Sequence, residues 1–327
     1  MLVAPRPAFI ALGLTLAAAA LLAILPVFLA PYSVRVGQLF LLAVGLGVAW
    51  TILGGFSGYW SFGNAAFVGT GAFAAALTQV AMGQSPAWLA FLVSLAVAAL
   101  VNALLALAIA WPILRLRGIY FAIAMLGVSQ VCFELVSNID WLHGAIGLNL
   151  LDIVPGSVPP ERFYYWALLV GAVAITVIAI GIRYSRIGYG LIAIREDEDT
   201  ARMLGVPTTR YKIVTFVISA TLTAMIGVIY AQNLGYITAN SVYRNDFNLN
   251  VIVYSLLGGM GTIAGPILGA AVMTYVTQVV LGELLDIHMF VTGLLLAVLV
   301  LAAPNGIIGI YDATRLNLRR RRLDAGG

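Results

Sequence analysis

The sequence predicts an all-α polytopic membrane protein, on the evidence of its composition and of the spacing of its apolar residues. Of the 327 residues, 62% are hydrophobic and only 9% are charged, and the mean hydropathy is +1.03. Soluble domains carry about 25% charged residues, so this chain has too few polar side chains to cover a surface in water. Apolar stretches of about twenty residues, long enough to cross a bilayer as a helix, recur along the chain. These observations exclude a soluble enzyme, a nucleic-acid-binding protein and a secreted disulfide-linked domain.

About ten transmembrane helices are expected within one transmembrane domain over residues 1–327. Helices are favoured because lipid offers no hydrogen-bond partner to the backbone, and the apolar runs lack the alternation of barrel strands. Two segments could be broken or re-entrant, since 62–82 is rich in small residues and 247–258 is short for a crossing. The expected spans are 8–30, 36–54, 62–82, 86–111, 118–139, 163–183, 211–232, 247–258, 262–281 and 286–303.

The first span has two features of a cleaved signal peptide, because Arg6 precedes it and Ala30 ends it. Its apolar stretch is, however, longer than the usual signal core of about 7–15 residues. We therefore expect span 8–30 to remain in the protein, although the orientation of the later spans does not depend on it.

The Lys and Arg residues give an independent test of the number of spans. An even number places both termini on one side, and short cytoplasmic loops carry an excess of Lys and Arg. Of the 17 Lys and Arg residues, only Arg35, Arg162 and Arg244 then fall outside. The others lie in the inner loops, above all 184–210, and at the termini, including the basic tail 304–327. A multi-pass topology with both termini in the cytoplasm is therefore expected.

Two polar loops are expected on the outer side. Loop 140–162 contains Asp140, Trp141 and several prolines, and it is long enough either to meet an extracytoplasmic partner or to serve as a plain connector. Loop 233–246 contains three Asn residues and Arg244, and it either completes an outer vestibule or is simply solvated.

Several kinds of site are not expected. The net charge of +4 does not indicate a nucleic-acid partner, because the basic residues are placed as topology signals. Cys132 is the single cysteine, which excludes an intrachain disulfide and a cysteine metal cluster. His143 and His288 are far apart and lack further ligands at metal-binding spacing.

The inner loop 184–210 is expected to hold a short amphipathic helix over 196–205. Acidic residues open it, where the helix dipole favours them, and Arg202 follows Glu198 at a stabilising spacing of four. Ala201, Met203 and Leu204 would form its apolar side, while Gly205 and Pro207 end it. So short a helix is marginal alone in water, so the membrane surface or a partner must hold it. Its acidic start disfavours anionic lipid and favours a protein partner.

Glycine is concentrated in two segments, 54–64 before the third span and 258–266 before the ninth. Small residues allow transmembrane helices to pack closely. A second interpretation is a broken backbone that lines a cavity, and paired interruptions in two halves of a chain point to a transport site. The two breaks follow different spans in the two halves, so an inverted repeat is only suggested.

These features favour a transport function. The sequence has no GxxxxGK[ST] phosphate loop and no Ser/His/Asp or HExxH arrangement, and Glu134 is the main charge within a span. Ion-driven transporters generally need buried ionisable groups. A permease driven by a separate ATPase, with helix 196–205 as the contact, is favoured over a passive channel or a membrane enzyme of unrecognised chemistry.

Four motifs, in order and at the family's spacing, resemble those of the LivM-type permease family of bacterial ABC importers for branched-chain amino acids. The resemblance extends over most of the chain. They are 61–67 (SFGNAAF) with Gly69 and Gly71; 115–122 (RLRGIYFA); 195–198 (REDE) with Ala201, Leu204 and Gly205; and 258–262 (GGMGT) with Gly265, Pro266 and Gly269.

The resemblance implies a heteromeric importer in the bacterial inner membrane. A second related permease of the LivH type would complete the path, two cytoplasmic ABC ATPases would use ATP and Mg²⁺, and a periplasmic solute-binding protein would deliver the solute. This chain would bind no cofactor and would have no catalytic site. Its ATPase-coupling segment would comprise Arg195, Glu196, Glu198, Asp199, Thr200, Ala201, Leu204 and Gly205.

The resemblance also implies a translocation path along Ser61, Asn64, Gln130, Gly258, Gly259 and Gly261. Asn64 stands where the family usually has His, and Gln130 stands near a position that is commonly acidic, so the lining would be hydrogen-bonding but uncharged. Branched-chain or other small hydrophobic amino acids are the expected solutes. Urea, short amides and aromatic acids, which related permeases carry, are alternatives, as is an ATPase-independent channel.

Overall fold

The computed structural model describes residues 6–83, 85–280 and 306–309. The expected tenth span, 286–303, the last residue of the expected ninth span and nearly all of the basic tail 304–327 lie outside the described residues, as does His288.

The first half of the chain consists of helices that follow the predicted spans. Pro31 and Pro160 each stand at the first position of a helix, where the missing N–H is not needed. A π-helical turn, Thr51–Gly55, extends the second helix toward the first glycine segment. The helices are α1 Arg6–Phe28, α2 Pro31–Trp50, α3 Asn64–Ala81, α4 Ala87–Ile113, α5 Ile119–Asn138 and α6 Pro160–Arg183.

The second half alternates short and long elements. They are α7 Arg186–Glu196, α8 Glu198–Met203, α9 Thr208–Leu234, α10 Ala239–Val242, α11 Asp246–Gly258 and α12 Ala264–Tyr275, the last continued by a π-helical segment, Val276–Val280. Two strands, β1 Leu148–Asn149 and β2 Tyr236–Ile237, and a short 3₁₀ turn, Asp140–Leu142, complete the described elements.

The all-α membrane class is confirmed, but a count of ten transmembrane helices is not. Six helices among the described residues are long and apolar enough to cross a membrane, and they correspond to α1, α2 with its π-helical extension, α4, α5, α6 and α9. Helices α11 and α12 have 13 and 12 residues, fewer than the about twenty that a full crossing needs. They pack against each other as a hairpin.

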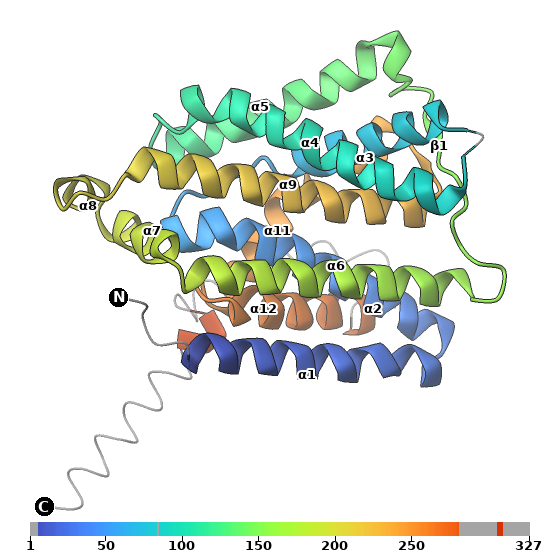
Figure 1. Ribbon diagram of the computed structural model, residues 1–327, viewed down its shortest axis with the longest axis horizontal. Coiled ribbons are helices and arrows are strands. Elements are labelled where there is room, and N and C mark those ends of the chain that lie inside the picture. Colours follow the sequence, from blue (N-terminus) through green and yellow to red (C-terminus); the bar gives the residue numbers. More distant parts are fainter. Residues whose placement is uncertain (1–5, 84, 281–305, 310–327) are drawn as a thin grey trace, which may run out of the picture.

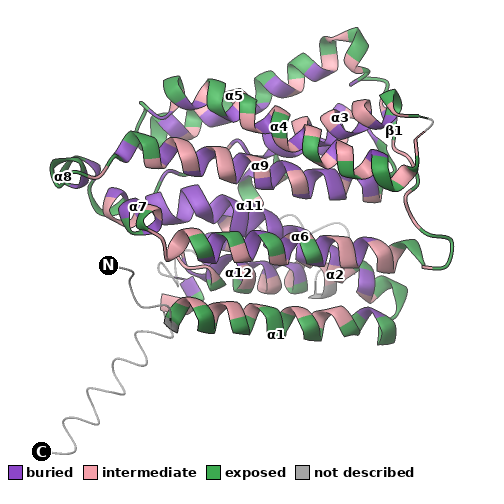
Figure 2. Cartoon of the chain, viewed as in Figure 1, coloured by how far each residue is buried: buried purple, intermediate pink, exposed green. Residues whose placement is uncertain are grey.

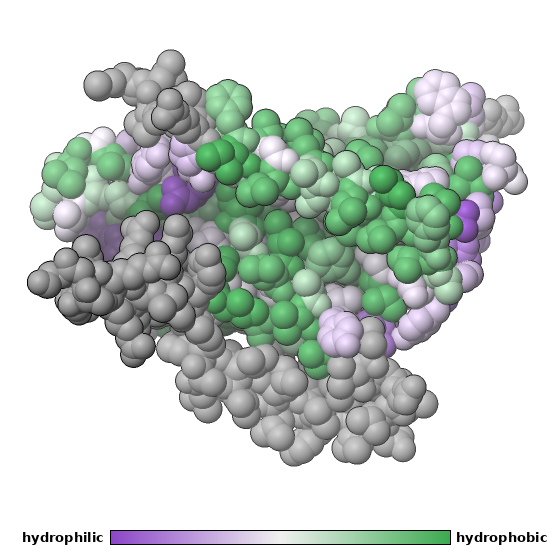
Figure 3. All heavy atoms as spheres, turned by 90° about the horizontal axis from the view of Figure 1, so that it is seen from below, coloured by the Kyte–Doolittle hydropathy of each residue, from purple (hydrophilic) through white to green (hydrophobic). Residues whose placement is uncertain are grey.

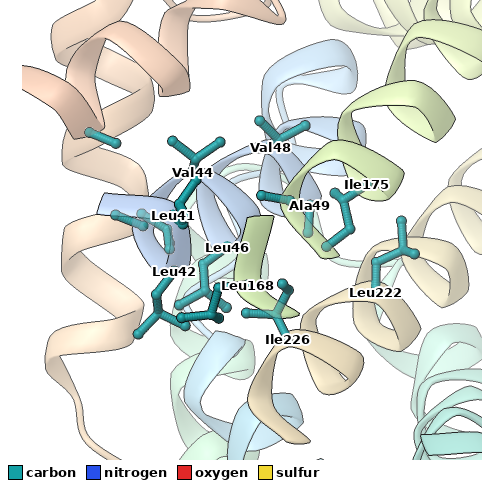
Figure 4. Close-up of a cluster of buried hydrophobic side chains, with 14 of the residues drawn as sticks. Leu41, Leu42, Val44, Leu46, Val48, Ala49, Leu168, Ile175, Leu222 and Ile226 are labelled. Atoms are coloured by element: carbon teal, nitrogen blue, oxygen red, sulfur yellow. The ribbon is translucent and has the colours of Figure 1, made fainter. Parts of the chain in front are cut away.

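The helices lie side by side along the long axis, with α7 and α8 at one end and β1 at the other (Figure 1). We call these the α8 end and the β1 end. Helix α9 is central and packs against α2, α3, α4 and α6. The largest core cluster joins α2, α6 and α9 through apolar side chains such as Leu41, Leu168 and Ile226 (Figure 4).

Glycines let the central helices approach closely. A Cβ atom on Gly71 of α3 would lie 2.8 Å from the carbonyl oxygen of Ala224 on α9. In return, a Cβ atom on Gly227 of α9 would lie 2.8 Å from the carbonyl oxygen of Val68. This close approach is the packing role that small residues have in membrane helices.

The outer surface of the described helices is apolar over most of its length. Helices α1 and α5 are largely exposed, whereas α2 is mostly buried (Figure 2). One face of the molecule is apolar across its middle and more hydrophilic toward both ends of the long axis (Figure 3). Large exposed apolar side chains such as Phe9, Leu14, Leu100 and Leu104 suit contact with lipid tails and not with water.

The two polar loops expected on the outer side are joined to each other. Strand β1 lies in the first and β2 follows α9 at the start of the second, and they pair antiparallel with Leu148 opposite Ile237. The Leu150 N–H also donates to the Gly235 carbonyl at 2.8 Å. These loops therefore form one structure at the β1 end, which neither local sequence pattern predicted.

Candidate functional site

Helix α8 differs from the predicted helix 196–205 in its bounds. The chain breaks at Asp197, whose extended backbone separates α7 from α8 and whose carboxylate accepts a hydrogen bond from the Thr200 N–H. Glu196 therefore ends α7, and α8 begins at Glu198. The predicted single helix was wrong here because the acidic run supplies a helix cap in its middle, as Asp often does. The α8 turn ends with Gly205 at φ +84°, a backbone region that favours glycine.

A buried ion pair fixes α8 to α9. The Lys212 Nζ lies 2.7 Å from Glu198 Oε1, and the exposed fractions of the two side chains are 4% and 8%. Lys212 also donates to the Tyr59 hydroxyl at 2.9 Å and to the Leu114 carbonyl at 3.2 Å. The Tyr59 hydroxyl donates to the other Glu198 oxygen. The pair is thus hydrogen-bonded on several sides, which a buried ion pair requires.

A second, more exposed layer links α8 to the loop between α4 and α5. Arg117 forms two parallel hydrogen bonds with the Asp199 carboxylate, at 2.8 and 2.9 Å. The exposed fractions of these side chains are 50% and 56%. Arg202 lies 3.2 Å from Glu198 at the predicted spacing of four residues. We call Tyr59, Arg117, Glu198, Asp199, Arg202 and Lys212 the charge cluster.

The charge cluster keeps its carboxylates ionised. Burial of Glu198 disfavours its charged form, but the hydrogen bonds from Lys212 and Tyr59 outweigh burial, and the pKa of Glu198 is lowered from its ordinary value. The hydrogen bonds from Arg117 lower the pKa of Asp199. Burial and the neighbouring Glu198 raise the pKa of the Tyr59 hydroxyl, which therefore stays protonated and donates.

A cavity of about 370 Å³ opens beside the charge cluster. It lies between the end of α4 and the start of α9, and the charged side chains of Arg115, Arg117, Arg202, Lys212 and Glu198 line it together with Trp111. The Arg115 guanidinium stacks 3.5 Å above the Trp111 ring. The α8 end thus presents a mainly cationic hollow.

Arg195 joins α7 to both glycine segments. Its guanidinium donates to the Gly55 carbonyl at 3.3 Å, and a Cβ atom on Gly261 would lie 2.0 Å from Arg195 Nη1. Gly261 has φ +81°, a backbone region that favours glycine, and Arg195 lies directly against it. The two segments that the sequence singled out separately therefore meet at the α8 end, around one arginine.

The remaining residues of the predicted coupling segment differ in exposure. Some lie at the base of α8, where it packs against the rest of the chain, and others lie at its exposed end, which we call the tip. Ala201 is buried in the cluster beneath α8, whereas Met203 and Leu204 are 86% and 79% exposed. The prediction that all three share one apolar side is therefore wrong. The sequence also required an outside partner to hold the helix, but contacts within the chain hold its base. What remains uncovered, within the described residues, is an apolar tip.

The predicted path residues lie in different surroundings. Ser61 and Asn64 are buried, and the Asn64 amide nitrogen has no hydrogen-bond partner among the described residues. Gln130 is exposed on α5. Gly258 packs against α12, where a Cβ atom would lie 1.7 Å from the Gly265 carbonyl oxygen, and Gly259 has φ +128° in the hairpin turn.

Sequence reasoning missed Tyr59, Arg117 and Lys212 as members of the site. Lys212 carried a signal, because it is a cation near the start of a long apolar helix. Arg117 lies in a motif that was noted for the family resemblance but was given no role. Nothing in the local pattern around Tyr59 pointed to α8, which is 139 residues away.

The sequence of this chain matches a known protein family and several known proteins. The family model described as "Branched-chain amino acid transport system / permease component" matches residues 28–301. The chain is 28% identical to the high-affinity branched-chain amino acid transport system permease protein LivM of Salmonella typhimurium, covering 90% of this chain and 73% of that protein. It is 27% identical to LivM of Escherichia coli, covering 84% and 70%.

A second kind of relative matches a shorter stretch. The high-affinity branched-chain amino acid transport system permease protein LivH of Salmonella typhimurium is 29% identical over 184 residues, which is 56% of this chain and 57% of that protein. The family model covers most of the spans described above. This multi-pass membrane protein therefore belongs to the family of permease components of branched-chain amino acid transport systems.

Proposed function

We propose that this chain is the transmembrane permease subunit of an ATP-driven ABC importer that moves branched-chain or other small hydrophobic amino acids from the periplasm to the cytoplasm. The names of its LivM and LivH relatives support the solute class. The sequence lacks a phosphate loop of its own, so the energy would come from partner ATPases that hold ATP and Mg²⁺. The chain itself would bind no cofactor.

One observation carries the coupling role, namely the way α8 combines a fixed base with a free tip. At the base, Glu198 and Asp199 are tied to α9 through Lys212 and to the loop before α5 through Arg117. At the tip, Met203 and Leu204 are exposed apolar side chains of the kind that fill a pocket on a partner. A push on the tip would therefore act on two spans together, and through Arg195 on both glycine segments.

This role sets the orientation and the partners. The α8 end would face the cytoplasm with both termini, where one of the two ATPases would hold the tip. The β1 end would face the periplasm, where the joined loops 140–162 and 233–246 would receive a solute-binding protein. A second, LivH-type permease would complete the path. The excess of Lys and Arg in the loops at the α8 end supports this orientation.

The solute path is part of the proposal. We place it along Ser61, Asn64, Gln130, Gly258, Gly259 and Gly261. The unpartnered amide nitrogen of buried Asn64 supports a polar role for the start of α3, because such a group is costly unless something pairs with it. The meeting of the glycine segments at Arg195 supports a constriction at the α8 end.

The test is transport by the complete assembly in proteoliposomes. This chain is co-expressed with a second, LivH-type permease, two ABC ATPases and a solute-binding protein, and uptake of radiolabelled leucine is measured. We expect uptake only with ATP and with all partners present. Leucine uptake by this chain alone without nucleotide would overturn the proposal in favour of a facilitator. ATP-dependent uptake of urea or an aromatic acid, but not of leucine, would change the solute class.

A further inference from the structure

Helix α5 exposes a row of polar side chains along one face. Gln130, Glu134 and Asn138 lie four residues apart, so they share one side of the helix, and all three are exposed. Hydrogen bonds connect them, because Gln130 Nε2 donates to Glu134 Oε1 at 3.0 Å and Asn138 Nδ2 donates to Glu134 Oε2 at 3.0 Å. Gly127, one turn before Gln130, is also exposed and has no atom near its Cβ position. We call Gly127, Gln130, Glu134 and Asn138 the α5 stripe.

The α5 stripe runs from the middle of a candidate span to the last residue of that span, Asn138. Helix α5 is one of the six candidate spans, and a helix rises about 1.5 Å per residue. Gln130 is therefore about 17 Å from the start of α5 at Ile119, and Glu134 is about 23 Å from it. In a hydrocarbon layer of about 30 Å, Gln130 is near the middle and Glu134 is in the half nearer the β1 end.

The span before α5, helix α4, keeps its polar residues Ser94 and Asn102 buried. It exposes Leu92, Leu100 and Leu104, as a helix facing lipid does. Helix α5 buries Phe121, Met125 and Cys132 against the rest of the chain and exposes its carboxylate. A charged group at this depth is costly in lipid and normally faces a protein interior or water. The α5 stripe is thus not built to face lipid.

Nothing within the described residues covers the α5 stripe. Packing of α5 is chiefly against α3 and α10, on the side opposite the stripe, where Ser129 meets Asn248 of α11. A soluble partner cannot reach the middle of a bilayer, and lipid tails offer no hydrogen bonds. What can cover the stripe is another membrane-spanning polypeptide, with or without enclosed water. Gly127 would let its helix approach closely.

We propose that the α5 stripe faces a second membrane-embedded permease chain across a hydrated gap, which forms the half of the solute path that opens at the β1 end. This inference rests on the proposed function, since it assumes a permease built from two chains. Exposed apolar side chains beside the stripe, Leu126, Val131 and Leu135, would pack against the second chain and seal the gap from lipid. The Glu134 carboxylate and its two amide neighbours then offer acceptors to the ammonium group of an amino acid.

Photocrosslinking identifies what covers the stripe. Benzoylphenylalanine is placed at position 130 or 134 of this chain, which is co-expressed with the tagged second permease and the other subunits, and intact membranes are irradiated. Matched controls carry the same group at positions 100 and 104 on α4. We expect the stripe positions to crosslink to the tagged permease at least tenfold more than the control positions do. Crosslinks to lipid alone, or to another part of this same chain, would overturn the inference.

Chemical accessibility tests the hydrated gap. In a Cys132→Ala background, Glu134→Cys and Leu104→Cys variants of the assembly are exposed to a charged methanethiosulfonate reagent. We expect rapid modification of the first and at least tenfold slower modification of the second. Equal, slow rates would overturn the hydrated gap. ATP-dependent uptake is measured in the same membranes. Crosslinks to lipid together with intact uptake would reject this inference but not the proposed function. The expected crosslinks without ATP-dependent uptake would reject the proposed importer function but not the contact between the α5 stripe and the second permease.

Discussion

The two ends of α9 are anchored by different chemistry. At the α8 end, Lys212 holds Glu198 in the charge cluster, and half-exposed Arg117 and Arg202 surround the pair. At the β1 end, Gln232 accepts from Gln79 Nε2 at 2.9 Å and donates to the Leu151 carbonyl, while the Leu151 N–H donates to Gln79 Oε1 at 2.9 Å. We call the latter the amide network.

The two ends of α9 are suited to different roles. The amide network is neutral and buried, and it satisfies its polar groups without charge, so it fixes a loop rigidly. The charge cluster places ion pairs partly in solvent, where a partner or a change in position can alter them. We therefore propose that the β1 end holds its loop in place and that the α8 end transmits force.

The largest effect on stability is expected from Lys212→Met. This change leaves the Glu198 carboxylate buried without its main cation, and removing one partner of a buried ion pair costs about 3–5 kcal/mol. Because Arg117 and Arg202 still lie near Glu198, we expect about 3 kcal/mol. Denaturant unfolding of the purified protein in detergent measures it.

A double variant checks the cause of that loss. Adding Glu198→Leu to Lys212→Met removes the orphaned charge and should recover part of the stability, since apolar replacement of a buried pair is often tolerated. If Lys212→Met alone were as stable as the parent, the pair would not anchor α8.

A smaller loss is expected from Gln232→Leu at the other end of α9. The change leaves the Gln79 amide and the Leu151 carbonyl without this partner, and an unsatisfied buried polar group costs about 1–3 kcal/mol. Because no charge is involved, the loss should be the same at low and high salt. A loss that shrinks as salt is added would argue against a neutral network at the β1 end.

The response to pH should separate the two ends further. The folded pKa values of Glu198 and Asp199 lie below their ordinary values, so their contribution is present at neutral pH and is lost as pH falls through those lowered values. We expect the stability difference between the parent and Glu198→Gln to be constant from pH 8 to about 5 and to shrink only below about 4. The difference for Gln232→Leu should not change over this range. A loss already complete at pH 6 would contradict the assigned direction.

The smallest effect on stability, with a large effect on function, is expected from Arg117→Gln. Arg117 and Asp199 are half exposed, and exposed ion pairs contribute little to stability. The pair is nevertheless the link between α8 and the loop before α5, so uptake should fall several-fold while ATP hydrolysis continues. The reciprocal double variant Arg117→Asp with Asp199→Arg should restore uptake in the proteoliposome assay. If the double variant folds but does not restore uptake, the Arg117–Asp199 pair does not transmit force from α8 to α5.

The sequence predicted the long helices well because a membrane-spanning helix requires a continuous apolar stretch, which is visible in the local sequence. Long apolar runs became α4, α6 and α9, and their ends moved by only a few residues. The prediction of one helix over 196–205 was wrong at Asp197. An acidic residue can lie in the first turn of a helix or cap the start of a new one, and the local sequence does not distinguish the two. Segment 247–258 became α11, nearly at its predicted bounds.

The candidate site was harder to predict because it is made of distant residues. Glu198, Asp199 and Arg202 lie within one loop and were noted from their spacing, but Tyr59 and Lys212 reach them from other segments of the chain. Likewise, the two glycine segments were visible in the sequence, whereas their meeting at Arg195 is a tertiary contact. The sequence pointed to Gln130 and Glu134 for separate reasons and did not predict the α5 stripe as a whole. The residue pattern of a single chain does not show which side of a membrane-spanning helix lacks a partner within that chain.

The central claim is that α8 transmits motion from the ATPases to the spans, and Gly205→Val tests it most directly. Gly205 has φ +84° and no atom within 4 Å of its Cβ position, so a β-branched residue strains the α8 tip without a clash. Gly13→Val in α1, where the Cβ position is equally open and φ is not positive, is the matched control. We measure leucine taken up per ATP hydrolysed in proteoliposomes of the full assembly. We expect this ratio to fall several-fold for Gly205→Val and not for Gly13→Val, and an unchanged ratio for Gly205→Val would show that α8 does not transmit motion.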